Sequence, residues 1–255
     1  MIGAITGDIV GSRFEFNNHR STDFELFHND CTFTDDTVMT VAVADAIMSG
    51  RPFGATMHEY GRRYKGRGYG GRFRRWLASD EPKPYDSFGN GSAMRVSPCA
   101  LLAHGDRERA LTLAASSAVC THNHPEGIKG ALATTDVILM AQQKADKDKI
   151  RSMVHALYGY RLDFTIGRLR KTYQFDETCQ GSVPQAIVAF LESESFEHCL
   201  RLAVSLGGDS DTIACIAGGM AEAYYGVPDD IREQTMAHLP EEMRRVVENM
   251  YLAAQ

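Results

Sequence analysis

Apolar residues spaced three and four positions apart constrain this chain most, because that spacing places them on one face of a helix. In the segment 195–203 they stand at positions i, i+3, i+4 and i+7, namely Phe196, Cys199, Leu200 and Ala203. Residues 111–118 repeat this template, whereas the alternation typical of strands is almost absent from the sequence. The sequence therefore predicts an all-α fold.

Glycine, proline and polar capping residues limit the other predicted helices. These helices run over 36–49, 92–103, 126–143, 183–192, 212–225 and 229–253, and the last is broken at Pro240. The stretches 67–71 and 87–91 are Gly-rich loops, and 144–149 is a charged turn. Because no linker or low-complexity segment divides the 255 residues, we expect a single domain over residues 1–255.

Composition and charge exclude several classes of protein. The 44% of hydrophobic and 24% of charged residues are typical of a globular domain and unlike disordered or collagen-like chains. A net charge of -6 argues against a protein that coats bare nucleic acid. Six scattered cysteines fit a reducing compartment, and neither a signal segment nor a membrane-spanning stretch is evident. We therefore expect a cytoplasmic protein without a membrane partner.

Two acidic motifs each stand where a loop enters an apolar helix: Thr34-Asp35-Asp36-Thr37 and Asp209-Ser210-Asp211-Thr212. Such residues are favoured helix caps, so capping alone is one interpretation. A cap needs one carboxylate, however, and each motif has two. Hard cations such as Mg²⁺ and Mn²⁺ prefer carboxylate and hydroxyl oxygens. Four aspartates with Thr34 and Thr212 could hold two such ions, a pair that can position and activate water.

Other polar loops each allow two interpretations. The loop 68–71 offers backbone N–H groups to a diphosphate or is a flexible turn, and the basic run 62–75 attracts an anion or is a solvated helix face. In 87–92, Phe88 could stack on a base beside polar groups, or Ser92 could simply cap a helix. The Cys and His residues of 120–124 lack the partners of a zinc site, which disfavours zinc.

Taken together, these motifs resemble the ADP-ribosylglycohydrolase family, to which dinitrogenase reductase-activating glycohydrolase belongs. The resemblance rests on Gly7–Gly11 with Glu15, on FTDDT at 33–37, on GNGSAMR at 89–95, on Thr121-His122 and on GGDSDT at 207–212. The motifs follow the family's order nearly end to end, and their combination is highly specific. The resemblance implies a single orthogonal bundle of α-helices with a binuclear Mg²⁺ or Mn²⁺ centre.

The resemblance also implies roles for individual residues. The metal positions would be Thr34, Asp35, Asp36, Asp209, Asp211 and Thr212. The same four aspartates would be catalytic together with Glu15, which would close or orient the site from a mobile segment. On sequence alone, Glu15 would be an exposed loop carboxylate. The implied substrate contacts are Gly68, Tyr69, Gly70, Gly71, Phe88, Gly89, Asn90, Gly91, Ser92 and His122, the last facing the distal ribose or the phosphates.

The function implied by the resemblance is removal of ADP-ribose from a modified protein, nucleic acid or small molecule. A metal-dependent hydrolase would cleave the N- or O-glycosidic bond at the anomeric carbon of the distal ribose. The aspartates would act mainly as ligands, and an uncoordinated oxygen among them as base. Two alternatives stay open: a two-metal diphosphate or phosphoester hydrolase, and an ADP-ribose-binding relative without turnover.

Overall fold

The structure is a computed structural model that describes residues 1–254. In this range it contains fourteen α-helices, two 3-10 helices and no strand, which confirms the predicted all-α fold. The α-helices are α1 (Ile2–Gly11), α2 (Asp35–Ser49), α3 (Phe53–Arg63), α4 (Gly71–Ala78), α5 (Ser97–Leu101), α6 (Arg107–Val119), α7 (Pro125–Gln142), α8 (Lys147–Tyr158), α9 (Ile166–Leu169), α10 (Cys179–Glu192), α11 (Phe196–Ser205), α12 (Ser210–Tyr225), α13 (Asp229–Ala237) and α14 (Glu241–Ala253). The 3-10 helices are η1 (Ser12–Phe14) and η2 (Asn90–Ser92).

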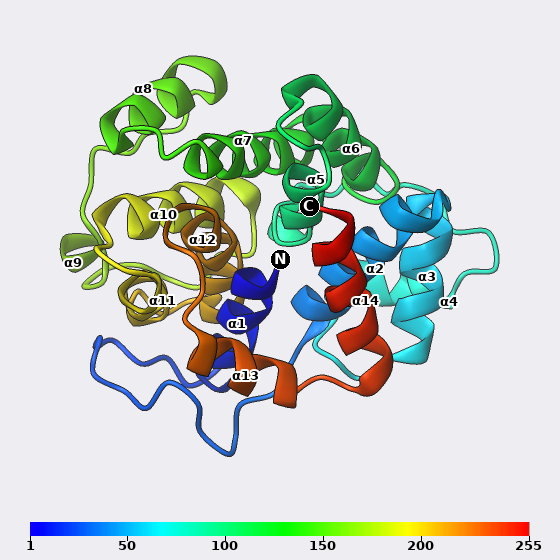
Figure 1. The fold of residues 1–255 in the computed structure, drawn as a ribbon, viewed down its shortest axis with the longest axis horizontal. Helices are drawn as coiled ribbons and strands as arrows, with labels where there is room; N and C mark the ends of the chain where they lie inside the picture. The colour runs from blue at the N-terminus through cyan, green and yellow to red at the C-terminus, as the bar shows by residue number, and fades with distance from the viewer. Residues whose placement is uncertain (255) are drawn as a thin grey trace.

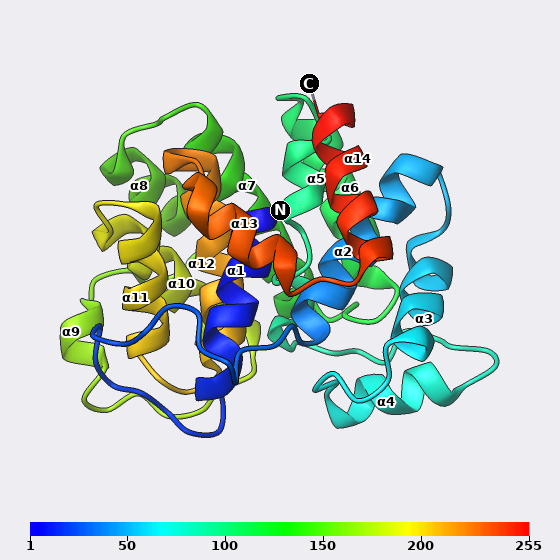
Figure 2. The same ribbon diagram turned by 60° about the horizontal axis from the view of Figure 1, so that its bottom comes forward.

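Helices α1 and α12 pack together at the centre of the molecule (Figure 1). Helices α7, α10 and α11 pack against α12 on one side, while α2 carries α3 and the C-terminal helix α14 on the other (Figure 2). The described part of the chain has no helix with the length and hydrophobicity needed to cross a membrane. This arrangement brings the first residues of α2 and α12 close to the last turn of α1.

The contact between α1 and α12 depends on glycines spaced four residues apart. A Cβ atom at Gly7 would lie 2.0 Å from the carbonyl oxygen of Ala214, and one at Gly11 would lie 2.4 Å from the Cα atom of Asp211. The two backbones are therefore in direct contact along this side of α1. Each helical glycine costs about 1 kcal/mol of helix propensity relative to alanine, which close packing here offsets. The sequence analysis did not predict α1.

The predicted helix over 92–103 is wrong in its first half, because within this range only α5, from Ser97 to Leu101, is α-helical. Pro98 has no N–H to donate to the Met94 carbonyl, so a continuous helix would lose that bond. The Met94 oxygen instead accepts hydrogen bonds from Thr40 Oγ1 at 3.3 Å and from Cys215 Sγ at 3.4 Å. Ser92 is likewise not a helix cap, since its hydroxyl donates to the Gly127 carbonyl at 2.7 Å.

Other predicted limits were closer to the structure. Helix α10 begins four residues before the predicted start at Val183, because Thr178 caps it by accepting from the N–H of Gly181 at 3.0 Å. Pro184 is then tolerated within the second turn of α10. Of the predicted charged turn 144–149, residues 147–149 instead form the first turn of α8, whereas the break at Pro240 separates α13 from α14 as predicted. Helices α3, α4, α8 and α9 were not predicted.

Candidate metal centre and the adjoining cavity

A cavity of about 340 Å³ opens beside the N-termini of α2 and α12. Thirteen of the predicted site residues line it: Glu15, Asp35, Asp36, Gly68, Gly70, Gly71, Gly89, Asn90, Gly91, His122, Asp209, Asp211 and Thr212. Segments from the beginning, middle and end of the chain thus meet around one space. Four other predicted residues, namely Thr34, Tyr69, Phe88 and Ser92, lie outside its wall.

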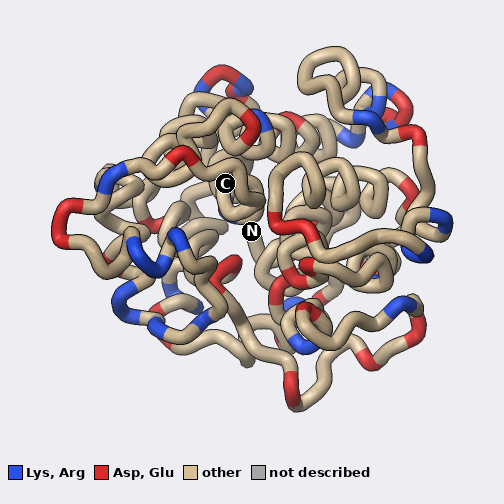
Figure 3. The backbone as a smooth tube through the Cα atoms, turned by 180° about the vertical axis from the view of Figure 1, so that it is seen from behind, with Lys and Arg blue, Asp and Glu red and all other residues tan. Residues whose placement is uncertain are grey.

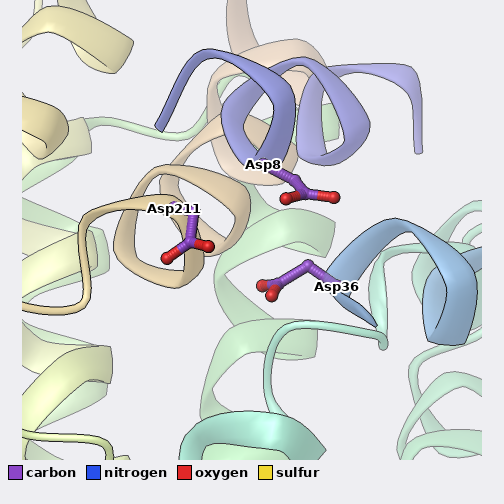
Figure 4. A group of neighbouring side chains, drawn as sticks. All are labelled: Asp8, Asp36 and Asp211. Carbon is purple, nitrogen blue, oxygen red and sulfur yellow. The ribbon is translucent and has the colours of Figure 1, made fainter. Parts of the chain in front are cut away.

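Three buried carboxylates from different helices converge beside the cavity, and Figure 4 shows them around a common space. Asp8 projects from α1, Asp36 from α2 and Asp211 from α12, and one oxygen of each lies within 4.8 Å of the others. A second group consists of Glu15, Asp209 and Asp211, whose oxygens meet the same distance limit. Asp211 belongs to both groups. The two groups therefore form one continuous acidic cluster.

Hydroxyl groups orient the Asp36 carboxylate. Its Oδ2 atom accepts hydrogen bonds from Thr34 Oγ1 and Thr212 Oγ1, each at 3.2 Å. Its Oδ1 atom is buried and receives no hydrogen bond from any residue in 1–254. An unpaired buried carboxylate oxygen is costly unless a cation or donor reaches it. Thr34 thus lies next to the cluster although it does not line the cavity.

Asp8 is the acidic residue that the sequence analysis did not include in the candidate site. Its Oδ2 atom accepts from the backbone N–H groups of Thr34 at 2.9 Å and Thr37 at 3.0 Å, and its Oδ1 atom accepts from Thr34 Oγ1 at 2.7 Å. These bonds tie the first turn of α2 to α1. In the sequence Asp8 is the one charged residue of an otherwise apolar stretch, and the structure shows that it is fully buried.

Asp35 lies apart from both carboxylate groups, although it lines the same cavity. Successive helix residues point about 100° away from each other, so Asp35 and Asp36 approach the cavity from different directions. The Asp35 side chain turns toward the loop before α4, where a Cβ atom at Gly68 would lie 3.1 Å from its Oδ1 atom. Its backbone N–H donates to the Arg67 carbonyl at 2.7 Å.

Burial and mutual repulsion oppose ionisation throughout the acidic cluster. Burial raises the pKa values of Asp36 and Asp211 well above the ordinary range, and neighbouring carboxylates raise them further. The pKa of Asp35 is raised for the same reasons. Burial, together with the charges of Asp209 and Asp8, raises the pKa of Glu15 to about 7. Without a cation nearby, the cluster therefore favours protonated carboxyl groups, because no described cationic side chain forms an ion pair with Asp36, Asp211 or Glu15.

This donor set fits divalent cations. Carboxylate and hydroxyl oxygens are the ligands that hard ions such as Mg²⁺ prefer, and nearby positive charge would favour the ionised carboxylates. The unpaired Oδ1 atom of Asp36 supplies a further free ligand position. The acidic cluster can therefore bind metal, and side chains from α2 and α12 contribute to it as the sequence motifs predicted.

Beyond Asp35, glycines and basic side chains line the cavity on the side of α4 and the loop before it. Gly68 has φ of +92°, which favours glycine, while Gly70 has open space where a Cβ atom would stand. Arg72 and Arg75 of α4 line this end, and Figure 3 shows several Lys and Arg positions along the backbone of the α3–α4 segment. The backbone here can approach an anionic ligand closely. The adjoining Tyr69 is buried, and its hydroxyl donates to the Tyr64 carbonyl at 2.9 Å.

The loop around η2 connects the two ends of the cavity. Asn90 Nδ2 donates to Asp209 Oδ2 at 2.7 Å and to Ser182 Oγ at 2.9 Å, so the loop holds one member of the acidic cluster. The half-exposed Phe88 ring packs edge-on against His124, next to cavity-lining neighbours. His122 is buried, and burial and the charge of Arg95 hold its pKa well below the usual range. Its imidazole is therefore neutral at physiological pH.

Comparisons with known proteins agree with this geometry. The model of the ADP-ribosylglycohydrolase family matches residues 1–255. ADP-ribosylhydrolase ARH3 of Danio rerio is 27% identical over an alignment covering 89% of this chain and 82% of that protein. ADP-ribosyl-(dinitrogen reductase) glycohydrolase of Rhodospirillum rubrum is 28% identical, covering 62% of this chain and 53% of that protein. A solved ADP-ribosylglycohydrolase-related protein complex shares the fold, with a TM-score of 0.72 at 23% identity and coverage of 100% of this chain and 97% of that one.

Proposed function

The chain belongs to the ADP-ribosylglycohydrolase family, and from that premise we propose that it removes ADP-ribose from a modified target by hydrolysing the glycosidic bond of the distal ribose. One observation carries this proposal: Asp36, Asp211 and other members of the acidic cluster line a cavity that is also lined by glycines and arginines suited to a diphosphate. A site with an acidic, metal-binding part and an anion-binding part can bind a ligand that carries hydroxyls at one end and phosphates further along. ADP-ribose has this order of groups.

We propose that two Mg²⁺ or Mn²⁺ ions complete the acidic end. The residues that would hold them are Thr34, Asp35, Asp36, Asp209, Asp211 and Thr212, with Glu15 and Asp8 beside them. Bound there, the ions would stabilise developing negative charge and lower the pKa of water. The shared position of Asp211 supports two neighbouring ions rather than two independent sites.

The protein's own groups would bind and orient the substrate. The glycine loop at 68–71 and the η2 loop would hold the diphosphate through backbone N–H groups, and the Phe88 ring at the rim is available to stack on adenine. The distal ribose would then lie at the acidic end, with its anomeric carbon facing Glu15 and Asp209. Asn90 would keep Asp209 in place by the bond described above. Fixed geometry of this kind lowers the entropic part of the barrier.

The names of two relatives favour an ADP-ribosylated protein as the substrate of this chain. The Rhodospirillum rubrum relative is named for dinitrogen reductase, and an ADP-ribosylarginine hydrolase of Pseudomonas putida is 25% identical over 60% of this chain. We propose a modified protein as the target class. Nucleic acid and small-molecule conjugates are the further substrates to test.

A panel of linkage-defined ADP-ribosylated substrates tests the function. Each substrate is incubated with Mg²⁺, Mn²⁺ or a chelator, and the product is identified by mass. Release of intact ADP-ribose that needs metal is the expected result. Release of AMP and ribose 5-phosphate would instead identify a diphosphate hydrolase. Binding of ADP-ribose without any release from the panel would identify a binding protein without turnover.

A further inference from the structure

Arg95 is a buried cation without a carboxylate partner. It follows η2, is 1% exposed and lines the cavity. Its Nη2 atom donates to the Ser117 carbonyl at 2.7 Å and to Thr121 Oγ1 at 2.8 Å, while its Nε atom has no partner within 1–254. Besides His122, its ionisable neighbours include a phenol and thiols, at Tyr85, Cys99, Cys120 and Cys179. Because buried charges are normally paired, a counter-charge is expected from the cavity.

Thr121 passes the orientation of Arg95 on to His122. A threonine hydroxyl has one proton and two lone pairs, and the guanidinium donates to one of those pairs. Two acceptors lie within reach of the Thr121 proton, His122 Nδ1 at 2.8 Å and the Cys120 sulfur, and an imidazole nitrogen accepts a hydrogen bond far better than a thiol does. The hydroxyl therefore donates to Nδ1. The proton of the neutral imidazole must then reside on Nε2.

His122 Nε2 points at the loop that lines the cavity. A Cβ atom at Gly91 would lie 3.1 Å from Nε2, and one at Gly89 would lie 3.5 Å from it, so glycines leave this face open. No group in residues 1–254 accepts a hydrogen bond from Nε2. This N–H is thus available to an oxygen of the ligand. The unmatched charge of Arg95 favours an anionic oxygen over a hydroxyl.

We propose that Arg95 and Thr121 are positioning residues that hold His122 as an Nε2–H donor to a phosphate oxygen of the ligand. The identity of the ligand rests on the proposed function, whereas the tautomer follows from the hydrogen bonds alone. Arg95 supplies the long-range positive charge, and Thr121 fixes which ring nitrogen carries the proton. His122 acts here as a fixed donor and not as an acid or base.

The tautomer is measured first, without ligand. Nitrogen-15 NMR of histidine-labelled protein at neutral pH distinguishes the Nε2–H tautomer, the Nδ1–H tautomer and the imidazolium. Wild type and Thr121→Ser should show Nε2–H, and Thr121→Val should show a mixture, because valine has the same shape without the hydroxyl. A wild-type spectrum of the Nδ1–H or imidazolium form would overturn the proposal.

Ligand binding then tests the phosphate contact. Thr121→Val should bind ADP-ribose about tenfold more weakly than wild type, and Thr121→Ser should bind it nearly as well. His122→Gln keeps an amide N–H near the Nε2 position and should lose less affinity than His122→Leu. Adenosine has no phosphate, so its affinity should be unchanged in Thr121→Val. An equal loss for adenosine, or no loss for ADP-ribose, would contradict the proposed contact.

Inorganic diphosphate separates this inference from the proposed function. If wild type binds diphosphate through Thr121 and His122 but does not bind ADP-ribose, the proposed function fails and the donor role stands. If it binds neither, the phosphate assignment is overturned. Thermal unfolding of each variant shows whether a loss of affinity reflects a loss of fold.

Discussion

The two ends of the cavity solve opposite electrostatic problems. At the acidic end, carboxylates from α1, α2 and α12 lie close together, and burial and then mutual repulsion raise their pKa values. At the other end, glycine backbone, a neutral imidazole and an unpaired guanidinium offer donors in a fixed arrangement. The first end needs added positive charge before its carboxylates are stable in the ionised form. The second is ready for an anion as it stands. A ligand that spans both ends would be oriented by charge alone.

Asp211→Asn should give the largest effect, because this carboxylate belongs to both acidic groups. We expect at least about a hundredfold loss of ADP-ribose release, as the change removes several kcal/mol of charge stabilisation. Turnover and Mn²⁺ binding are measured together. Asp230→Asn, on the exposed first turn of α13, is the matched control and should behave like wild type. Full activity of Asp211→Asn would remove the basis for a shared ion site.

Asp8→Asn should weaken metal binding about 10- to 100-fold while leaving the cavity wall intact. The amide oxygen can still accept from the N–H groups of Thr34 and Thr37, but the NH2 group cannot accept from Thr34 Oγ1, and the side chain no longer carries a charge near the ions. Calorimetric titration with Mn²⁺ measures this. Asp45→Asn changes a carboxylate near the C-terminal end of α2, where it accepts a hydrogen bond from Tyr60, and should leave the affinity for Mn²⁺ unchanged. Equal affinities in all three proteins would argue against a supporting role for Asp8.

Metal should change how stability depends on pH. In the metal-free protein, the pKa of Glu15 is raised from 4.5 to about 7, so its stabilising contribution is fully present below 4.5 and is lost as pH rises through 7. The raised pKa values of the buried aspartates act in the same direction. Thermal unfolding between about pH 5 and about pH 8 should show a falling Tm with chelator and a flatter curve with Mn²⁺. A Tm that rises with pH in chelator would contradict this sign.

Gly70→Ala should have the smallest effect and act on the anionic end alone. A Cβ atom at Gly70 meets nothing within 4 Å in the protein, so Tm should stay the same or rise slightly. If a diphosphate approaches this backbone, the methyl group should weaken ADP-ribose binding several-fold, on the order of 1 kcal/mol. Gly167→Ala in α9 also points into open space and serves as control. Unchanged affinity for ADP-ribose would place the phosphates elsewhere.

Local patterns allowed the helix starts of the acidic motifs to be predicted from sequence. The predicted starts at Asp36 and Thr212 lie within two residues of the observed ones, because polar residues before an apolar run mark a helix N-terminus. The same motifs also indicated the ADP-ribosylglycohydrolase family, and the match of the family model over residues 1–255 confirms that prediction. Both successes depend on residues that are close together in the chain.

The missed features depend on contacts between distant segments. Asp8 joins the cluster only because α1 lies between α2 and α12, and no local pattern announces that neighbourhood. The bond from Asn90 to Asp209 joins residues 119 positions apart. The prediction of a helix over 92–103 was wrong for a local reason, because Pro98 disfavours a helix that continues through the residues before it.

The direct backbone contact between α1 and α12 fixes the separation of these two helices. With no side chain between the two backbones near Gly7 and Gly11, the distance from Asp8 to Asp211 is set by the van der Waals radii of main-chain atoms. Rotamer changes elsewhere cannot widen or narrow it. An alanine at Gly11 would have to push α1 away from Asp211, the residue that belongs to both sets of carboxylates. The first measurable effect should therefore be a change in the preference for one divalent ion over another.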